Sequence, residues 1–191
     1  MRRLSQLVLG VLSVVCVTGC KEDVKPKPKG FLALEYPSPE YRRVDIGCPY
    51  TFEKNDLAEI SPSRNNIPCW IDLEYGSMKG TIFITYQTVN NNLDSLLRDA
   101  QKLPLQHTIK ADVIEGDVYT NEYNNTYGMF YEVEGDAASQ AQFYLTDSTR
   151  HFLTGSVYFN SVPNFDSIVP AADYLKKDIR HLMESLKWRN N

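Results

Sequence analysis

Residues 170–188, PAADYLKKDIRHLMESLKW, contain the clearest helix of the chain and decide the fold. The apolar residues of this stretch recur at intervals of three and four positions: Ala171, Leu175, Ile179, Leu182 and Leu186. Such a stripe lies on one face of a helix and packs against a core. Pro170 suits the start of the helix, where its missing N–H group costs little. The stretch therefore predicts a C-terminal helix with one buried face.

Strand patterns fill the sequence before this helix. Residues 73–75 and 81–86 flank a loop bounded by glycines, which predicts a hairpin. A second helix is expected from 93 to 103, where leucines recur at helical spacing until Pro104 ends the run. Four further segments are predicted to be strands: 110–119, 128–133, 142–146 and 150–159. We therefore expect an α+β fold in which a single antiparallel sheet packs with two long helices as a layered α/β/α sandwich, an order of elements that resembles the PsbP-like fold.

The composition indicates a globular protein. Of the 191 residues, 42% are hydrophobic and 23% are charged, which excludes a disordered tail, a collagen-like fibre and a polytopic membrane protein. The net charge is −4 and the basic residues are scattered. Because a nucleic-acid-binding protein carries a basic patch, we expect no nucleic acid among the partners.

The N-terminus has the layout of an export signal. Two arginines open the chain, and an apolar run follows over residues 7–17 that is too short to span a bilayer as a helix. The next small residues end at Cys20 in the letters VTGC. These letters resemble the lipobox of bacterial lipoproteins, in which the cysteine carries acyl chains such as palmitate and becomes the first mature residue. We therefore expect a signal peptide over 1–19 and a lipid on Cys20.

A tether and one domain follow the signal. Residues 20–30, CKEDVKPKPKG, lack an apolar period, and their spaced prolines favour an extended spacer. Residues 31–191 contain no internal repeat and are expected to form a single globular domain. A multiply acylated N-terminus is held at a membrane effectively permanently. We therefore expect a lipid-anchored protein of the cell envelope that faces the periplasm or the cell surface, with the choice between inner and outer membrane left open.

The cysteines fit an exported protein. Cys16 leaves with the signal and Cys20 carries the lipid, so Cys48 and Cys69 remain. In an oxidising compartment two free cysteines favour a disulfide, and their spacing is not the C-x-x-C of a redox centre. The three histidines lie far apart in the sequence, so we expect no metal site.

The sequence contains no motif of a known catalytic or nucleotide-binding site. G-x-G-x-x-G, H-E-x-x-H and G-x-S-x-G are all absent from it. Ser156 follows a glycine but lies within an alternating strand, and His151 begins the same strand. We therefore predict a protein that is not an enzyme and that has no cofactor. A hydrolase assembled from distant segments is a lesser alternative.

Three Asp-Ser-X triplets are similar to a short O-glycosylation signal of exported bacterial proteins. Their serines are Ser95, Ser148 and Ser167. Asp and Ser are also favoured at helix caps and turns, which explains the triplets equally well. We expect at most one of the three to be modified.

Four tyrosines recur every fourth residue: Tyr119, Tyr123, Tyr127 and Tyr131. Glycine and asparagines between them break any helix, so they are expected on strands and a turn. An aromatic rim of this kind could hold a glycan or a partner protein, since tyrosine combines an apolar body with a polar tip. The alternative is a half-buried sheet face with tyrosines at its edge.

Blocks along nearly the whole mature chain resemble the family of the gliding-motility lipoprotein GldD. The blocks are YPSPEY (36–41), CPYTFE (48–53), CWIDLEY (69–75), MKGTIFITYQ (78–87), DAQKL (99–103), YGMFYEVEGDAASQAQFYLTDS (127–148), HFLTGSVYFN (151–160) and PNFDSIVPAADYLKKDI (163–179). The resemblance implies a lipid on Cys20, a role in surface gliding and an association with the type IX secretion machinery. It also implies an envelope partner, with the membrane protein GldE as one candidate, and it supplies no catalytic residue.

The leading hypothesis is a non-catalytic, lipid-anchored envelope protein that serves gliding motility and type IX secretion through protein–protein contacts. The alternative is an envelope lipoprotein that binds a ligand or glycan on the tyrosine-rich rim.

Overall fold

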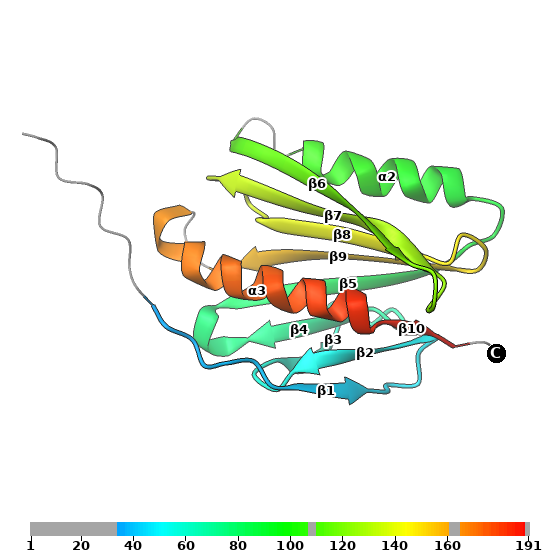
Figure 1. Cartoon of the computed structure of the whole chain (residues 1–191), viewed down its shortest axis with the longest axis horizontal. Helices are drawn as coiled ribbons and strands as arrows, with labels where there is room; N and C mark the ends of the chain where they lie inside the picture. Colours follow the sequence, from blue (N-terminus) through cyan, green and yellow to red (C-terminus); the bar gives the residue numbers. More distant parts are fainter. Residues whose placement is uncertain (1–33, 107–109, 161–164, 190–191) are drawn as a thin grey trace, which may run out of the picture. The chain divides into compact units, whose positions relative to one another are not determined.

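A computed structural model describes residues 34–106, 110–160 and 165–189, and this part of the chain is mostly β. Ten strands of the described part form two sheets, one of seven strands and one of three, and two α-helices accompany them (Figure 1). The helices are α2 (Leu93–Leu105) and α3 (Phe165–Ser185). A short 3-10 helix, η1 (Gly76–Met78), joins two neighbouring strands of the larger sheet.

The seven-stranded sheet is antiparallel, with the strand order β3-β4-β5-β9-β8-β7-β6. Its strands are β3 (Glu59–Pro62), β4 (Ile71–Tyr75), β5 (Gly80–Thr88), β6 (Ala111–Asn121), β7 (Thr126–Gly135), β8 (Ala141–Thr146) and β9 (His151–Phe159). The β4–β5 hairpin confirms a connection predicted from the sequence, and the predicted strands 142–146 and 150–159 form a second hairpin as β8 and β9. β9 also pairs with β5 along its whole length, from Phe159 opposite Gly80 to His151 opposite Thr88. The centre of the sheet is therefore built from segments that are distant in the chain.

The three-stranded sheet has the order β1-β2-β10. Its strands are β1 (Tyr41–Val44), β2 (Tyr50–Asn55) and β10 (Lys187–Trp188). β10 follows α3 and pairs with β2, so the C-terminal end of the described chain closes this sheet. The predicted disulfide is present between Cys48, just before β2, and Cys69, just before β4, with Cα atoms 5.5 Å apart. This bond links the small sheet to the large one.

The predicted α/β/α sandwich, with a single antiparallel sheet and two long helices in the manner of the PsbP-like fold, is wrong. The described chain has two sheets and is mostly β, with helices of only 13 and 21 residues. The sequence pattern missed the second sheet for a physical reason. β1 has four residues and β10 has two, and strands this short show too little alternation to be recognised. The boundaries predicted at residues 19 and 30 lie outside the described residues.

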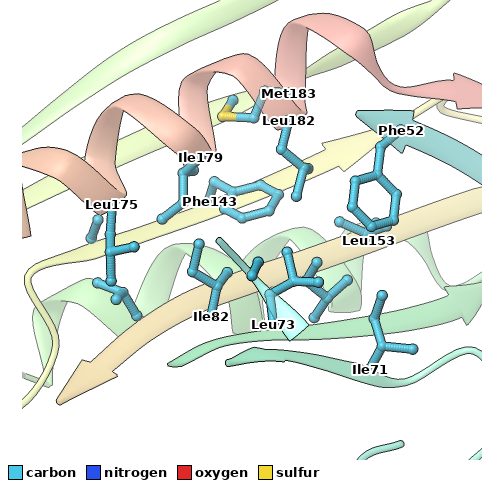
Figure 2. Close-up of a cluster of buried hydrophobic side chains, with 14 of the residues drawn as sticks. Phe52, Ile71, Leu73, Ile82, Phe143, Leu153, Leu175, Ile179, Leu182 and Met183 are labelled. Atoms are coloured by element: carbon cyan, nitrogen blue, oxygen red, sulfur yellow. The ribbon is translucent and has the colours of Figure 1, made fainter. Parts of the chain in front are cut away.

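The predicted apolar stripe of α3 is confirmed as its buried face. Leu175, Ile179 and Leu182 are at most 2% exposed, and Figure 2 shows them pointing at Phe143, Leu153 and other apolar side chains of the strands. We call the side of the large sheet that faces α3 its inner face. Burial of such side chains contributes about 1.5–3 kcal/mol each, so this contact between helix and sheet contributes strongly to stability.

A buried carboxylate interrupts the apolar face of α3. Asp178 is 4% exposed, and its two oxygens accept hydrogen bonds from the Tyr41 hydroxyl at 2.6 Å and from Asn55 Nδ2 at 2.9 Å. The Tyr41 ring also stacks on His181, one turn further along the helix, with ring centroids 3.6 Å apart. Burial raises the pKa of Asp178, while the hydrogen bonds oppose that shift. The network fixes β1 and β2 against α3.

The other side of the large sheet, its outer face, is covered only in part by α2. Leu96 and Ala100 of this helix pack with Tyr144 of β8 and Phe152 of β9 in a second, smaller apolar cluster. α2 ends near Pro104, as predicted, although the proline lies within its last turn. Beyond this cluster the outer side of β4 and β5 and the far end of β9 have no helix against them in the described residues.

Candidate functional site

The uncovered part of the outer face is built by β4, β5 and β9. Successive residues of a strand point to opposite faces of the sheet. Because the core residues of these strands face α3, the residues between them face outward. The strand register places Asp72 opposite Phe83 and Thr81 opposite Tyr158 on this face. Acidic and aromatic side chains from three strands therefore meet there.

Two hollows lie on this face. The first, which we call the outer-face hollow, has a volume of about 550 Å³. It is lined by Ser61, Pro62, Arg64, Asp72, Glu74, Thr81, Phe83, Tyr158, Phe159 and Asn160. The second has a volume of about 470 Å³ and lies between α2 and the outer side of β5 and β9, with Thr85, Leu96 and Thr154 in its wall. Both hollows are lined by outward-facing residues of β5 and β9.

A buried carboxylate without a hydrogen bond lies in the wall of the outer-face hollow. Asp72 is 8% exposed, and within the described ranges no group donates a hydrogen bond to its side chain. Arg64 attracts it electrostatically, but the two form no ion pair there. Burial and the neighbouring Glu74 carboxylate raise the pKa of Asp72. The charged form of Asp72 is therefore disfavoured in the folded chain, and a counter-charge in the hollow would relieve the cost.

Aromatic rings and hydroxyl groups complete the surface. The rings of Phe83 and Tyr158 meet edge to face, with centroids 5.7 Å apart and planes at 71°, and Tyr158 is 38% exposed. Glu74 accepts a 2.5 Å hydrogen bond from the Ser61 hydroxyl. No three His, Cys, Asp or Glu side chains are grouped as a metal site anywhere in the described ranges. The arrangement suits recognition of a ligand or partner that carries positive charge.

Comparison with known protein families assigns the chain to one of them. Residues 21–188 match the family model described as gliding motility lipoprotein GldD. The chain belongs to this family. Membership associates the chain with gliding motility and with a lipid-anchored position in the cell envelope. The family consists of lipoproteins and is not a known enzyme family. The comparison with curated proteins found no match.

None of the helices in the described part of this GldD-family chain is long and apolar enough to cross a membrane. The predicted lipid-bearing Cys20 lies outside the described residues. Its acylation stays a prediction.

The four tyrosines predicted to share a rim lie on different surfaces of this GldD-family chain. Tyr119 is on the inner side of β6, where its hydroxyl donates a 3.0 Å hydrogen bond to the Met183 carbonyl. Tyr127 and Tyr131 point to the outer side of β7, since Thr120 rather than Tyr119 lies opposite Tyr127. Tyr123 occupies the β6–β7 turn and is 92% exposed. The structure thus separates Tyr119 from the others, and binding of a glycan by these residues stays a prediction.

The three predicted glycosylation serines occupy a helix start, a turn and a helix. Ser95 is exposed in the first turn of α2, and Ser148 is exposed in the β8–β9 turn with a φ of 64°. Their backbone N–H groups donate hydrogen bonds to the Asn92 carbonyl and to Thr146 Oγ1. Ser167 belongs to α3, and its side chain lies outside the described set. Modification of any of the three stays untested.

The two described histidines contact side chains of neighbouring elements. His151, expected at a turn edge, is 7% exposed, and its Nδ1 lies 2.8 Å from the Tyr86 hydroxyl. Burial lowers the pKa of His151. His181 lies 2.9 Å from a carboxylate oxygen of Glu53, and His107 is outside the described residues. The two described histidines thus help to hold β5, β9 and α3 in place.

Sequence reasoning missed the residues of the outer-face hollow. Alternation in β4 and β5 marks Asp72 and Phe83 as outward-facing, but an outward aspartate is ordinarily solvated. The burial of Asp72 arises from β3 and from the segment after it, whose positions no local pattern reveals.

Proposed function

We propose that this GldD-family chain is a non-catalytic, lipid-anchored envelope component that serves gliding motility and the type IX secretion machinery through protein–protein contacts. The outer-face hollow carries the proposal, because it combines aromatic rings with a buried carboxylate that lacks a hydrogen-bond partner in the described chain. Aromatic side chains beside polar groups are typical of protein interfaces. GldE, the membrane protein that the resemblance associates with the family, is the first candidate partner.

The predicted lipid anchor at the N-terminus would hold the outer face near a membrane. A lipid on Cys20 would hold the chain at a membrane, and residues 21–30 would keep the domain at a short distance from it. A surface held close to a membrane meets membrane-bound partners at high effective concentration. A modest contact area would then suffice for a stable association.

One experiment tests whether the domain beyond the anchor is required. Cells that express residues 1–30 alone are compared with cells that express the full chain, and both colony spreading and secretion of type IX cargo are measured. We expect both activities to be lost without residues 31–191. Retention of both would overturn the proposal.

A matched pair of variants tests the outer face. Tyr158→Lys places a cation in the outer-face hollow, whereas Tyr123→Lys makes the same chemical change in the exposed β6–β7 turn. We expect Tyr158→Lys to abolish spreading at normal protein abundance and Tyr123→Lys to leave it unchanged. The opposite result would favour the alternative, a ligand or glycan site around Tyr123.

A further inference from the structure

We propose that the outer-face hollow binds one cationic side chain, a guanidinium or an ammonium group, that a partner protein presents. The inference rests on the function proposed above and specifies the chemistry of its contact. It identifies Asp72 as the residue that pairs with the incoming charge, with Glu74 beside it and the rings of Phe83 and Tyr158 against the cation.

The other buried charges of the described chain show why Asp72 is unusual. Asp147 is 6% exposed and accepts hydrogen bonds from three backbone N–H groups and the Thr149 hydroxyl. Asp178 is paired as described above. Lys54 is 6% exposed and donates to two backbone carbonyls. Buried charges are normally compensated in this way. Asp72, at 8% exposed, has no such partner among the described residues, and its carboxylate opens into the hollow, where a cation from outside can reach it.

The charges around the hollow favour a cation. Asp72 and Glu74 line it, and the register of β3 with β4 places Glu59 opposite Glu74 on the same face. Arg64 is the one basic residue in the lining, and it forms no ion pair among the described residues. Three carboxylates therefore face one guanidinium, which leaves a net negative surface.

The aromatic rings distinguish an organic cation from a metal ion. Phe83 lies directly opposite Asp72 in the strand register, and the ring of Tyr158 meets the ring of Phe83 edge to face. A guanidinium stacks on aromatic faces while its N–H groups bind carboxylates in pairs. Calcium instead takes six to eight oxygen ligands, and no three His, Cys, Asp or Glu side chains are grouped to hold a metal ion in the described part of the chain. The hollow therefore fits an arginine or lysine side chain better than a bare ion.

Titration with a defined probe tests the inference. The full mature chain in non-ionic detergent is titrated with acetyl-Gly-Arg-Gly-amide and with the citrulline counterpart, which has nearly the same shape but no charge. NMR follows the carboxyl carbon of Asp72. We expect the arginine peptide to bind at least about tenfold more tightly than the citrulline peptide, since a hydrogen bond to a charged group contributes roughly 1.5–3 kcal/mol. Equal binding of the two peptides would overturn the inference.

Variants of the chain assign the effect to Asp72. Asp72→Asn should weaken the arginine peptide at least about tenfold, whereas Asp94→Asn, which removes the same charge from the exposed first turn of α2, should leave its affinity unchanged. Arg64→Gln should strengthen binding, because it removes the competing cation. An unchanged affinity in Asp72→Asn, or displacement of the peptide by equimolar calcium chloride, would refute the assignment.

The inference and the proposed function can fail separately. The peptide titration judges the cation site without reference to gliding, and the Tyr158→Lys strain judges the outer face without reference to the charge of its partner. Loss of spreading in that strain together with equal binding of the two peptides would refute the cation site alone.

Discussion

Reduction of the Cys48–Cys69 disulfide should lower the free energy of unfolding by about 3 kcal/mol. The two cysteines are separated by 21 positions, and the chain-entropy relation gives about 3 kcal/mol for a loop of this length. A loss of this size is a large fraction of the roughly 5–15 kcal/mol that holds a typical domain folded. The bond joins the start of β2 to the start of β4, so the small sheet should loosen from the large one first.

Thermal unfolding with and without a phosphine reductant measures the effect. For a domain of about this size each kcal/mol shifts Tm by roughly 2–4 °C, so we expect a fall of about 6–12 °C. A variant with Cys48→Ala and Cys69→Ala should show the lower Tm and no response to the reductant. An unchanged Tm in a sample whose thiols are shown to be free by alkylation would refute the reasoning.

Three further substitutions have defined outcomes. Asp72→Asn should raise the free energy of unfolding at pH 7 but not at pH 3, as measured with urea. The raised pKa of Asp72 makes its charged form costly in the folded chain. That cost is absent below the usual aspartate pKa of about 3.9 and appears as the pH rises through the pKa of Asp72 in the folded chain. Gly128→Ala should cost at least about 3 kcal/mol in the same assay, because its Cβ would lie 1.9 Å from a backbone oxygen of β8. Asp178→Ala should cost about 2–5 kcal/mol, since it removes the acceptor of the Tyr41 hydroxyl and one of the two acceptors of the buried Asn55 amide.

Contrary results or matched controls test these three predictions. A destabilised Asp72→Asn at neutral pH would show that the carboxylate has a partner in the folded chain. Gly76→Ala has open space around its Cβ and should change stability by no more than about 0.5 kcal/mol. The same limit applies to Asp173→Ala, whose side chain is 59% exposed on α3. Equal losses in Asp173→Ala and Asp178→Ala would contradict the role given to the buried network.

The elements with strong local patterns were predictable from the sequence. The apolar stripe of α3 and the glycine-bounded β4–β5 hairpin appear in the structure where the periodicity places them. Asp178 also had a signal, since it lies three residues after Leu175 and four before Leu182 and therefore on the buried stripe of the helix. An aspartate at such a position indicates a buried polar network.

The second sheet and the outer-face hollow depend on contacts that no local pattern specifies. β10 has two residues, and its partner β2 lies near the other end of the described chain. Asp72 alternates with core residues like any solvated outward side chain, and its burial depends on packing by β3 and the segment around Arg64. The lack of a hydrogen-bond partner is visible only once these segments are in place.

Gliding speed of single cells that carry Tyr158→Lys tests the central claim most directly, with Tyr123→Lys cells measured on the same surface. The account predicts that Tyr158→Lys cells stop moving, like cells that lack residues 31–191, while Tyr123→Lys cells glide at the wild-type speed. Wild-type speed in Tyr158→Lys cells with normal protein abundance would contradict it.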